Sequence, residues 1–258
     1  MTRLPLVCVL ALLGTGIGHA GQPLETETAR LLPQGKFKIE STFEFQTSPN
    51  GREKSAPLAV EYGLLDRLEL LVEPVFYTAI RPDVGRNASG MGDLEMTLTY
   101  LAFKESPRRP AMALAMEVKF PTAHDTLIGT GKTDYTPFVI ASKRFGKLDL
   151  HANLGYTFVG QPPGPKLKNT IDYALACEYK FNDKWVMVGE VTGNTSSLTG
   201  AEQGASNENS VIPEASGGER IALVGARYYL NPDMFFSLGL SYDNSRAILV
   251  RPGFTFRF

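Results

Sequence analysis

Apolar and polar residues alternate with a period of two along most of this chain. The clearest stretch is residues 36–47, KFKIESTFEFQT, in which apolar side chains share one face and charged or hydroxyl side chains share the other. Such alternation is typical of a β-strand with one apolar face. The same strong pattern recurs at residues 148–159, 171–181 and 248–258.

Weaker copies of the pattern fill the intervals between these four stretches. In residues 133–145 and 220–230 either face could be the apolar one. Most stretches have about the nine to eleven residues that a tilted strand needs to cross a bilayer. The sequence therefore predicts an all-β fold, a transmembrane antiparallel up-and-down β-barrel of about twelve strands within residues 36–258. The remaining eight strands are expected at 57–64, 67–78, 91–104, 111–121, 133–145, 185–194, 220–230 and 234–243.

The connections between the predicted strands alternate in length. Short connections are expected at 65–67, 105–109, 146–147, 182–184 and 231–233, and longer polar ones at 48–56, 80–90, 122–132, 160–168 and 193–218. Short periplasmic turns and longer outer loops are the pattern of an outer-membrane barrel. The last hairpin, near Asn244, is short on the side where a long loop is expected.

The first twenty residues have the features of a secretory signal peptide. Arg3 precedes an apolar run of about ten residues, and the segment ends in small residues up to Ala20. We expect cleavage after Ala20, an N-terminal periplasmic segment at 21–35, and localisation in a bacterial outer membrane. Cleavage leaves Cys177 as the single cysteine, which cannot form an internal disulfide.

Composition leaves soluble β-sandwiches and membrane barrels in play. The net charge is −1, so the basic field of a nucleic-acid binder is lacking. A soluble, secreted sandwich would have shorter strands and no reason to place aromatic residues at strand ends. Here aromatic pairs end several strands, for example Tyr179 with Phe181, as in the interfacial girdles of membrane barrels. These features favour the barrel.

Two resemblances sharpen this interpretation. The final PGFTFRF, with Phe254, Phe256 and Phe258, resembles the C-terminal signal recognised by bacterial barrel-assembly machinery. The segments GLLDRLELLVEPVF (63–76), GMGDLEMTLTYLAF (90–103) and KFPTAHDTLIGTGKTDYTPFVIASKRFG (119–146) together resemble the outer-membrane family of meta-pathway phenol-degradation transporters. The second resemblance implies a channel-like barrel with aromatic or hydrophobic solutes.

The polar face of the predicted strands should line the lumen, and acidic residues predominate on it. We expect passive passage of small molecules, favouring cations or neutral solutes, with a closed barrel serving as a structural or interaction platform as the alternative. The lumen could be plugged by residues 193–218 or by 21–35. Solutes could also leave laterally where Pro74, Pro137 or Pro252 interrupts the hydrogen-bond ladder. The candidate lumen-lining residues are Glu40, Glu44, Glu69, Glu73, Glu95, Glu117, Lys119, His151, Asp172, Glu178, Glu190 and Arg251.

Catalytic motifs find no support in the sequence. The Gly-x-Ser-x-Gly elbow of serine hydrolases is missing, and no spacing of cysteine and histidine suits zinc. His124 beside Asp125 could form an acid–base pair at the outer rim, although a solvated loop pair is favoured. We therefore expect no enzyme activity, cofactor or metal. The expected partners are outer-membrane lipid, the assembly machinery and a small-molecule solute, with the protein a monomer that binds no nucleic acid.

Overall fold

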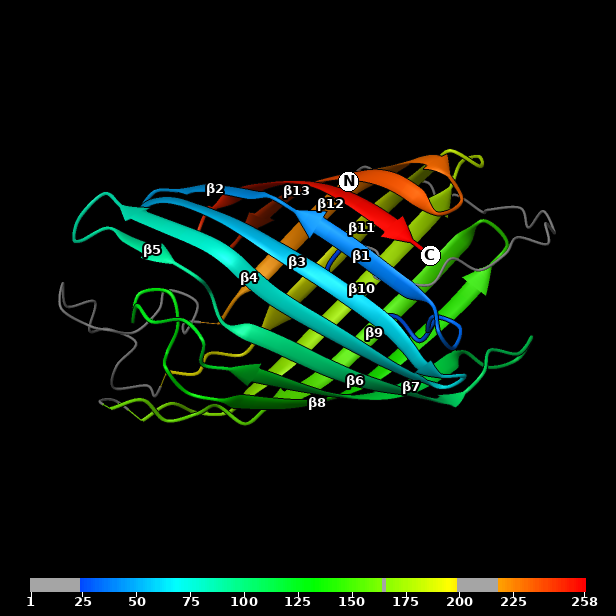
Figure 1. Cartoon of the computed structure of the whole chain (residues 1–258), viewed down its shortest axis with the longest axis horizontal. Coiled ribbons are helices and arrows are strands. Elements are labelled where there is room, and N and C mark those ends of the chain that lie inside the picture. Colours follow the sequence, from blue (N-terminus) through cyan, green and yellow to red (C-terminus); the bar gives the residue numbers. More distant parts are fainter. Residues whose placement is uncertain (1–23, 164–165, 199–217) are drawn as a thin grey trace, which may run out of the picture.

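A computed structural model of the chain describes residues 24–163, 166–198 and 218–258. Within these residues the chain forms one antiparallel sheet that closes into a barrel around a central lumen (Figure 1). The strands are β1 (Phe37–Thr42), β2 (Glu44–Ser48), β3 (Gly51–Leu65), β4 (Leu68–Pro82), β5 (Ala88–Gly90), β6 (Leu94–Phe103), β7 (Ala111–Phe120), β8 (Asp134–Phe145), β9 (Leu148–Thr157), β10 (Thr170–Lys180), β11 (Trp185–Asn194), β12 (Arg220–Asn231), β13 (Met234–Asp243) and β14 (Ile248–Arg257).

The barrel closes where the first and last strands meet. β1 pairs with β14, with Ile39 opposite Phe256, and also with β3 on its other side. In Figure 1 these first and last strands lie side by side, in blue and red. The end of the chain completes the seam, since Phe37 and Phe258 exchange backbone hydrogen bonds of 2.9 and 3.0 Å. Every described strand except the three-residue β5, which pairs only with β4, is paired on both sides, so the membrane-crossing part of the sheet is closed as a bilayer requires.

The fourteen segments make twelve spans, as the alternation predicted, because two spans are interrupted. β1 and β2 follow one line between β3 and β14, with a break at Phe43, whose N–H donates to the carbonyl of Pro252 at 3.0 Å. β5 and β6 both pair with β4, with a break at residues 91–93 directly after Pro74 on the partner strand. Proline lacks the N–H that a continuous ladder needs. The third proline of the lateral hypothesis, Pro137, lies opposite Met116 in a continuous ladder with β7, whereas the ladder of β8 with β9 begins only at Phe138.

The β3–β4 hairpin is longer than predicted. Residues 49–56, expected in a long loop, belong mainly to β3, which pairs with β2 on one side and with β4 up to Pro82 on the other. In residues 49–56 the alternation of apolar and polar residues has ended, although the strand pairing continues. A strand that projects beyond the lipid keeps its backbone pairing but has no hydrocarbon to face, so its outward side chains need not be apolar. Arg52 and Lys54, on the outward face, show this change.

The outer face of the barrel is apolar and the inner face is polar. Aromatic residues gather at strand ends, where Trp185 packs on Tyr228 with ring centroids 4.8 Å apart and Tyr179 packs edge-on against Phe181 at 4.9 Å. This arrangement is the lipid-facing belt with aromatic girdles of an outer-membrane barrel. Large exposed apolar side chains in the belt include Leu98, Leu114, Val139, Leu154, Leu175, Val191, Val224, Leu238 and Leu240.

Register settles the two strands whose faces were ambiguous. In β8 the buried residues Thr136, Ile140 and Ser142 face inward, and Val139 faces the lipid. In β12 Leu223 and Arg227 are buried while Val224 is exposed. The described residues hold no helix of the length and apolar character needed to cross a membrane.

Candidate functional site: the lumen of the barrel

The twelve predicted lumen residues all lie on the inward-facing positions of their strands. Seven of them border one cavity of about 610 Å³ in the half of the lumen that carries the longer loops. The others, nearer the short turns or at mid-depth, are Glu40, Glu69, His151, Glu178 and Glu190. The seven that border the cavity are Glu44, Glu73, Glu95, Glu117, Lys119, Asp172 and Arg251.

The cavity carries more carboxylates than cations. Lys119 lies 2.7 Å from Asp134 and 3.6 Å from Asp93, and Arg251 contacts Glu44 at 3.3 Å. A second set of carboxylates in the cavity comprises Glu73, Glu95 and Glu117. Among the described residues, none of these three carboxylates forms a hydrogen bond or an ion pair. The cavity therefore presents a negative field to an entering solute.

Residues 24–32 lie inside the barrel and fill the half of the lumen on the side of the short turns. The side chains of Leu24, Thr26, Ala29 and Leu32 are all buried. Sequence reasoning placed this segment either in the periplasm or in the lumen as a plug, and the described part of it packs against the inner wall. The predicted signal peptide, 1–20, and most of the other plug candidate, 193–218, lie outside the described residues.

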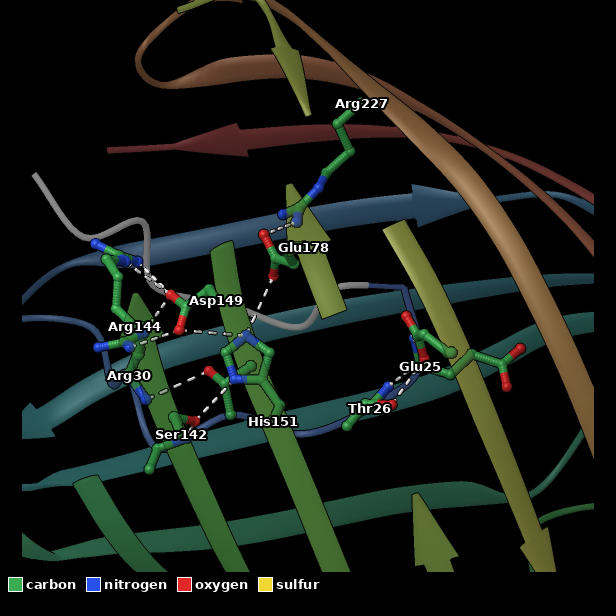
Figure 2. Close-up of polar contacts among 12 residues, drawn as sticks. Glu25, Thr26, Arg30, Ser142, Arg144, Asp149, His151, Glu178 and Arg227 are labelled. Atoms are coloured by element: carbon green, nitrogen blue, oxygen red, sulfur yellow. Dashed lines mark hydrogen bonds and ion pairs between the residues drawn. The ribbon is translucent and has the colours of Figure 1, made fainter. Parts of the chain in front are cut away.

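Arg30 anchors this segment to the barrel (Figure 2). Its guanidinium donates to the two carboxylate oxygens of Asp149 at 2.7 and 2.6 Å, and to Glu105 at 2.8 Å. Arg144 also binds Asp149. A guanidinium held by two oxygens of one carboxylate is a strong, directional contact, and all of these groups lie near the short turns.

A buried polar network continues from this anchor along the wall (Figure 2). Ser142 Oγ lies 2.8 Å from His151 Nδ1, and His151 Nε2 lies 3.6 Å from Glu178 Oε1. Glu178 in turn forms an ion pair with Arg227. The Ser142 hydroxyl is 1% exposed and accepts the backbone N–H of Ala29, so a solute cannot reach it. The network therefore holds the segment in place and leaves no accessible nucleophile.

Sequence reasoning did not find Arg227, Ser142 or Arg30. Arg227 and Ser142 belong to the two strands in which either face could be the apolar one, so the alternation of apolar and polar residues could not show which side chains point inward. Arg30 precedes the first strand and had no periodic context. The sequence did contain one indication that a segment lies inside the barrel, namely the small inward-facing residues Ala111, Ala113 and Ala115. A wall of such small residues leaves room for a chain in the lumen.

The outer loops do not form the acid–base pair considered for His124 and Asp125. Instead the Arg86 guanidinium donates to both oxygens of Asp125 at 2.7 Å, and His124 Nδ1 lies 3.0 Å from the carbonyl of Thr122. The contact ties residues 83–87 to residues 121–133. In the described part of the chain, no group of three or more His, Cys, Asp or Glu side chains is arranged to hold a metal ion.

This loop contact should survive mild acid. The hydrogen bond from Arg86 lowers the pKa of Asp125 to about 2, so the carboxylate that pairs with Arg86 is lost only as the pH falls through that value. Titration of Asp125 followed by carboxyl NMR should therefore show its midpoint near 2. In Arg86→Gln the midpoint should return toward the ordinary value of about 3.9. A midpoint that is the same in both proteins would contradict the contact.

A closed barrel with an apolar outer belt, aromatic girdles and a charged lumen defines a transmembrane β-barrel of the bacterial outer membrane. The chain belongs to the family described as "Putative MetA-pathway of phenol degradation", whose model matches residues 20–258. The family expected from three sequence segments is thereby confirmed. No curated protein matches the chain.

Solved structures support the same fold. The NanC porin is 14% identical, with a TM-score of 0.59 over 84% of this chain and 98% of that one. The KdgM porin in complex with disordered oligogalacturonate is 11% identical, with a TM-score of 0.56 over 86% of this chain and 99% of that one. At these identities the likeness concerns the fold.

Proposed function

We propose that this barrel passes small molecules passively across the outer membrane. The observation that carries the proposal is the cavity of about 610 Å³ lined by charged side chains from strands on several sides of the barrel. A water-filled passage needs such a polar interior, whereas a barrel with only a structural role could be filled by apolar side chains. The family's description further supports aromatic or hydrophobic solutes such as phenols.

The carboxylates of the cavity set the charge preference. Because Glu73, Glu95 and Glu117 are not neutralised by a cation in contact, cations and neutral solutes should enter more readily than anions. Loss of all three carboxylates should weaken this preference without abolishing it, because the remaining carboxylates of the cavity still outnumber its cations. A small aromatic alcohol is neutral at ordinary pH, so the acidic lining does not oppose its entry.

Residues 24–32 limit passage in the described state. The barrel conducts when this segment leaves the lumen or shifts within it, and the contact made by Arg30 opposes that motion. The second candidate, a closed barrel acting as a structural or interaction platform, is favoured by this same filling of the lumen. Conductance separates the two candidates.

Single-channel recording of the refolded protein in a planar bilayer, across a salt gradient, tests the proposal. We expect infrequent cation-preferring openings in the natural protein, and openings at least about tenfold more frequent in Arg30→Glu. That substitution sets like charges against Asp149 and Glu105, a loss of at least about 1.4 kcal/mol. The matched control, Arg86→Glu in an exposed outer loop, should leave the opening frequency unchanged. Folded protein that never conducts in any of these forms would favour the platform.

We also propose two properties of the molecule in its membrane. The last strand, with Phe254, Phe256 and Phe258, would be recognised by the barrel-assembly machinery during insertion. The barrel would then act as a monomer in contact with outer-membrane lipid, because its belt is apolar around the described circumference.

A further inference from the structure

The wall of the lumen holds residues 24–32 mainly by their backbone. The carboxylate of Glu190 accepts the N–H groups of Glu25 at 3.2 Å and Thr26 at 3.0 Å, and the hydroxyl of Thr26 at 2.8 Å. Glu69 accepts the N–H of Leu32 at 2.5 Å. Such contacts recognise the backbone of a bound chain and depend little on the side chains that it carries, although the chain must bend at Glu25 and Thr26 to direct two successive N–H groups to one carboxylate.

Two more wall residues add to this set. Ser142 accepts the N–H of Ala29 at 2.9 Å, and Arg251 donates to the carbonyl of Leu24 at 3.4 Å. The four wall residues come from β4, β8, β11 and β14, so they surround the segment instead of lining one side of it. In this way the backbone polar groups of an enclosed chain are satisfied.

The wall also has space shaped for a chain. A Cβ atom added to Gly225 would lie 2.5 Å from the Leu24 side chain, and one added to Gly63 would lie 2.2 Å from the carbonyl of Pro33. Leu24 joins an apolar cluster with Val186, Val188, Leu223, Tyr229 and Phe235. The lack of a side chain at Gly225 thus leaves room for Leu24, and at Gly63 it leaves room for the chain where the segment ends, at Leu32 and Pro33.

A second apolar seat lies further along the segment. Ala29 packs with Ala113, Ile140 and neighbouring residues of β6 and β7. Arg30 then enters its pair of carboxylates, Asp149 and Glu105. The wall therefore has one site for an apolar side chain, occupied by Leu24, and one for an arginine side chain six residues later, occupied by Arg30. Between these two sites the wall contacts the backbone of the segment.

We propose that the lumen half near the short turns is a binding site for a peptide, and that residues 24–32 are its tethered ligand. The site would also take a separate peptide with an apolar residue six positions before an arginine. Tethering gives the resident segment an effective concentration of about millimolar, so a free peptide competes poorly until the segment is weakened. This inference concerns binding and stands apart from the proposed passage of solutes.

The test uses full-length protein in detergent and a fluorescent peptide, LETETARLLPQG, with the sequence of residues 24–35. Anisotropy should show at least about tenfold tighter binding to Arg30→Glu than to the natural protein, because the weakened resident segment no longer fills the site. Leu24→Asp, which places a charge in the apolar cluster that holds Leu24, should expose the site in the same way. Gel mobility before and after heating identifies the folded barrels, and only folded variants are compared.

Two controls decide whether the peptide occupies this site. A peptide with glutamate in place of its arginine should bind Arg30→Glu at least about tenfold more weakly than the natural sequence. Adding Glu190→Ala to Arg30→Glu should weaken binding of the natural peptide, since its backbone loses an acceptor. Equal binding of both peptides, or no gain in either folded anchor variant, would overturn the proposal. Because the readout is binding, it is independent of whether the barrel conducts.

Discussion

Removal of Phe258 will weaken the closed barrel by about 3–5 kcal/mol. The residue exchanges two backbone hydrogen bonds with Phe37, at 2.9 and 3.0 Å, across the seam between first and last strands. Its ring also stacks on Phe37 and Phe256, with centroids 5.3 and 5.4 Å apart. Each such hydrogen bond contributes about 1 kcal/mol, and an aromatic pair adds about 0.5–1.5 kcal/mol. Urea unfolding of protein refolded into lipid vesicles measures this loss.

The matched control is Phe145→Ala, which removes an exposed aromatic ring from the end of β8, away from the seam. It should cost distinctly less than removal of Phe258. The proposed role in assembly is separable from this stability effect. Phe258→Ala keeps the backbone bonds, so its refolding into vesicles should be only mildly impaired, while its level in the outer membrane of cells should fall steeply. Equal loss in vesicles and in cells would argue against recognition of the terminal strand.

Replacement of Glu178 by alanine will destabilise the barrel by about 3–5 kcal/mol. Glu178 forms an ion pair with Arg227, whose side chain is 2% exposed and lies 5.6 Å from the centre of the Phe235 ring. Alanine would leave this guanidinium enclosed without its carboxylate, and an uncompensated buried charge is costly. The same unfolding assay in vesicles would measure the change.

A double substitution tests this explanation. Glu178→Ala with Arg227→Met removes both charges and should recover most of the stability lost in the single variant. The control is Asp183→Ala, which breaks an exposed pair with Lys180 at 3.0 Å and should change stability by less than about 1 kcal/mol. A double variant no more stable than Glu178→Ala would show that the packing of these side chains, and not their charge, is what matters.

The strands could be predicted from the sequence because the bilayer imposes a simple rule on every strand that crosses it. Each crossing must satisfy its backbone through neighbours and must show apolar residues outward at every second position. The rule identified all twelve spans and put residues such as Glu95 and Glu117 on the inner face. It failed at the β3–β4 hairpin, which extends beyond the lipid and is no longer subject to it.

The contacts among the lumen side chains could not be predicted in the same way. Glu190 is 164 residues from Thr26, and Arg30 is 119 residues from Asp149. No local pattern relates residues at such distances, and their approach depends on the register and tilt of every strand between them. The buried pair of Glu178 and Arg227 joins β10 to β12 across an intervening strand for the same reason.

The sequence by itself thus determined the class of protein, the number of spans and the acidic character of the lumen, because each depends on residue type and a period of two, and the resemblance of three segments indicated the family. The tertiary structure alone decided that residues 24–32 occupy the lumen. That outcome depends on space left by inward alanines and glycines and on acceptors such as Glu69 and Glu190 converging from separate strands. Whether a barrel interior is empty or occupied depends on the side chains of all strands of the closed wall together, and the sequence of a single strand does not reveal it.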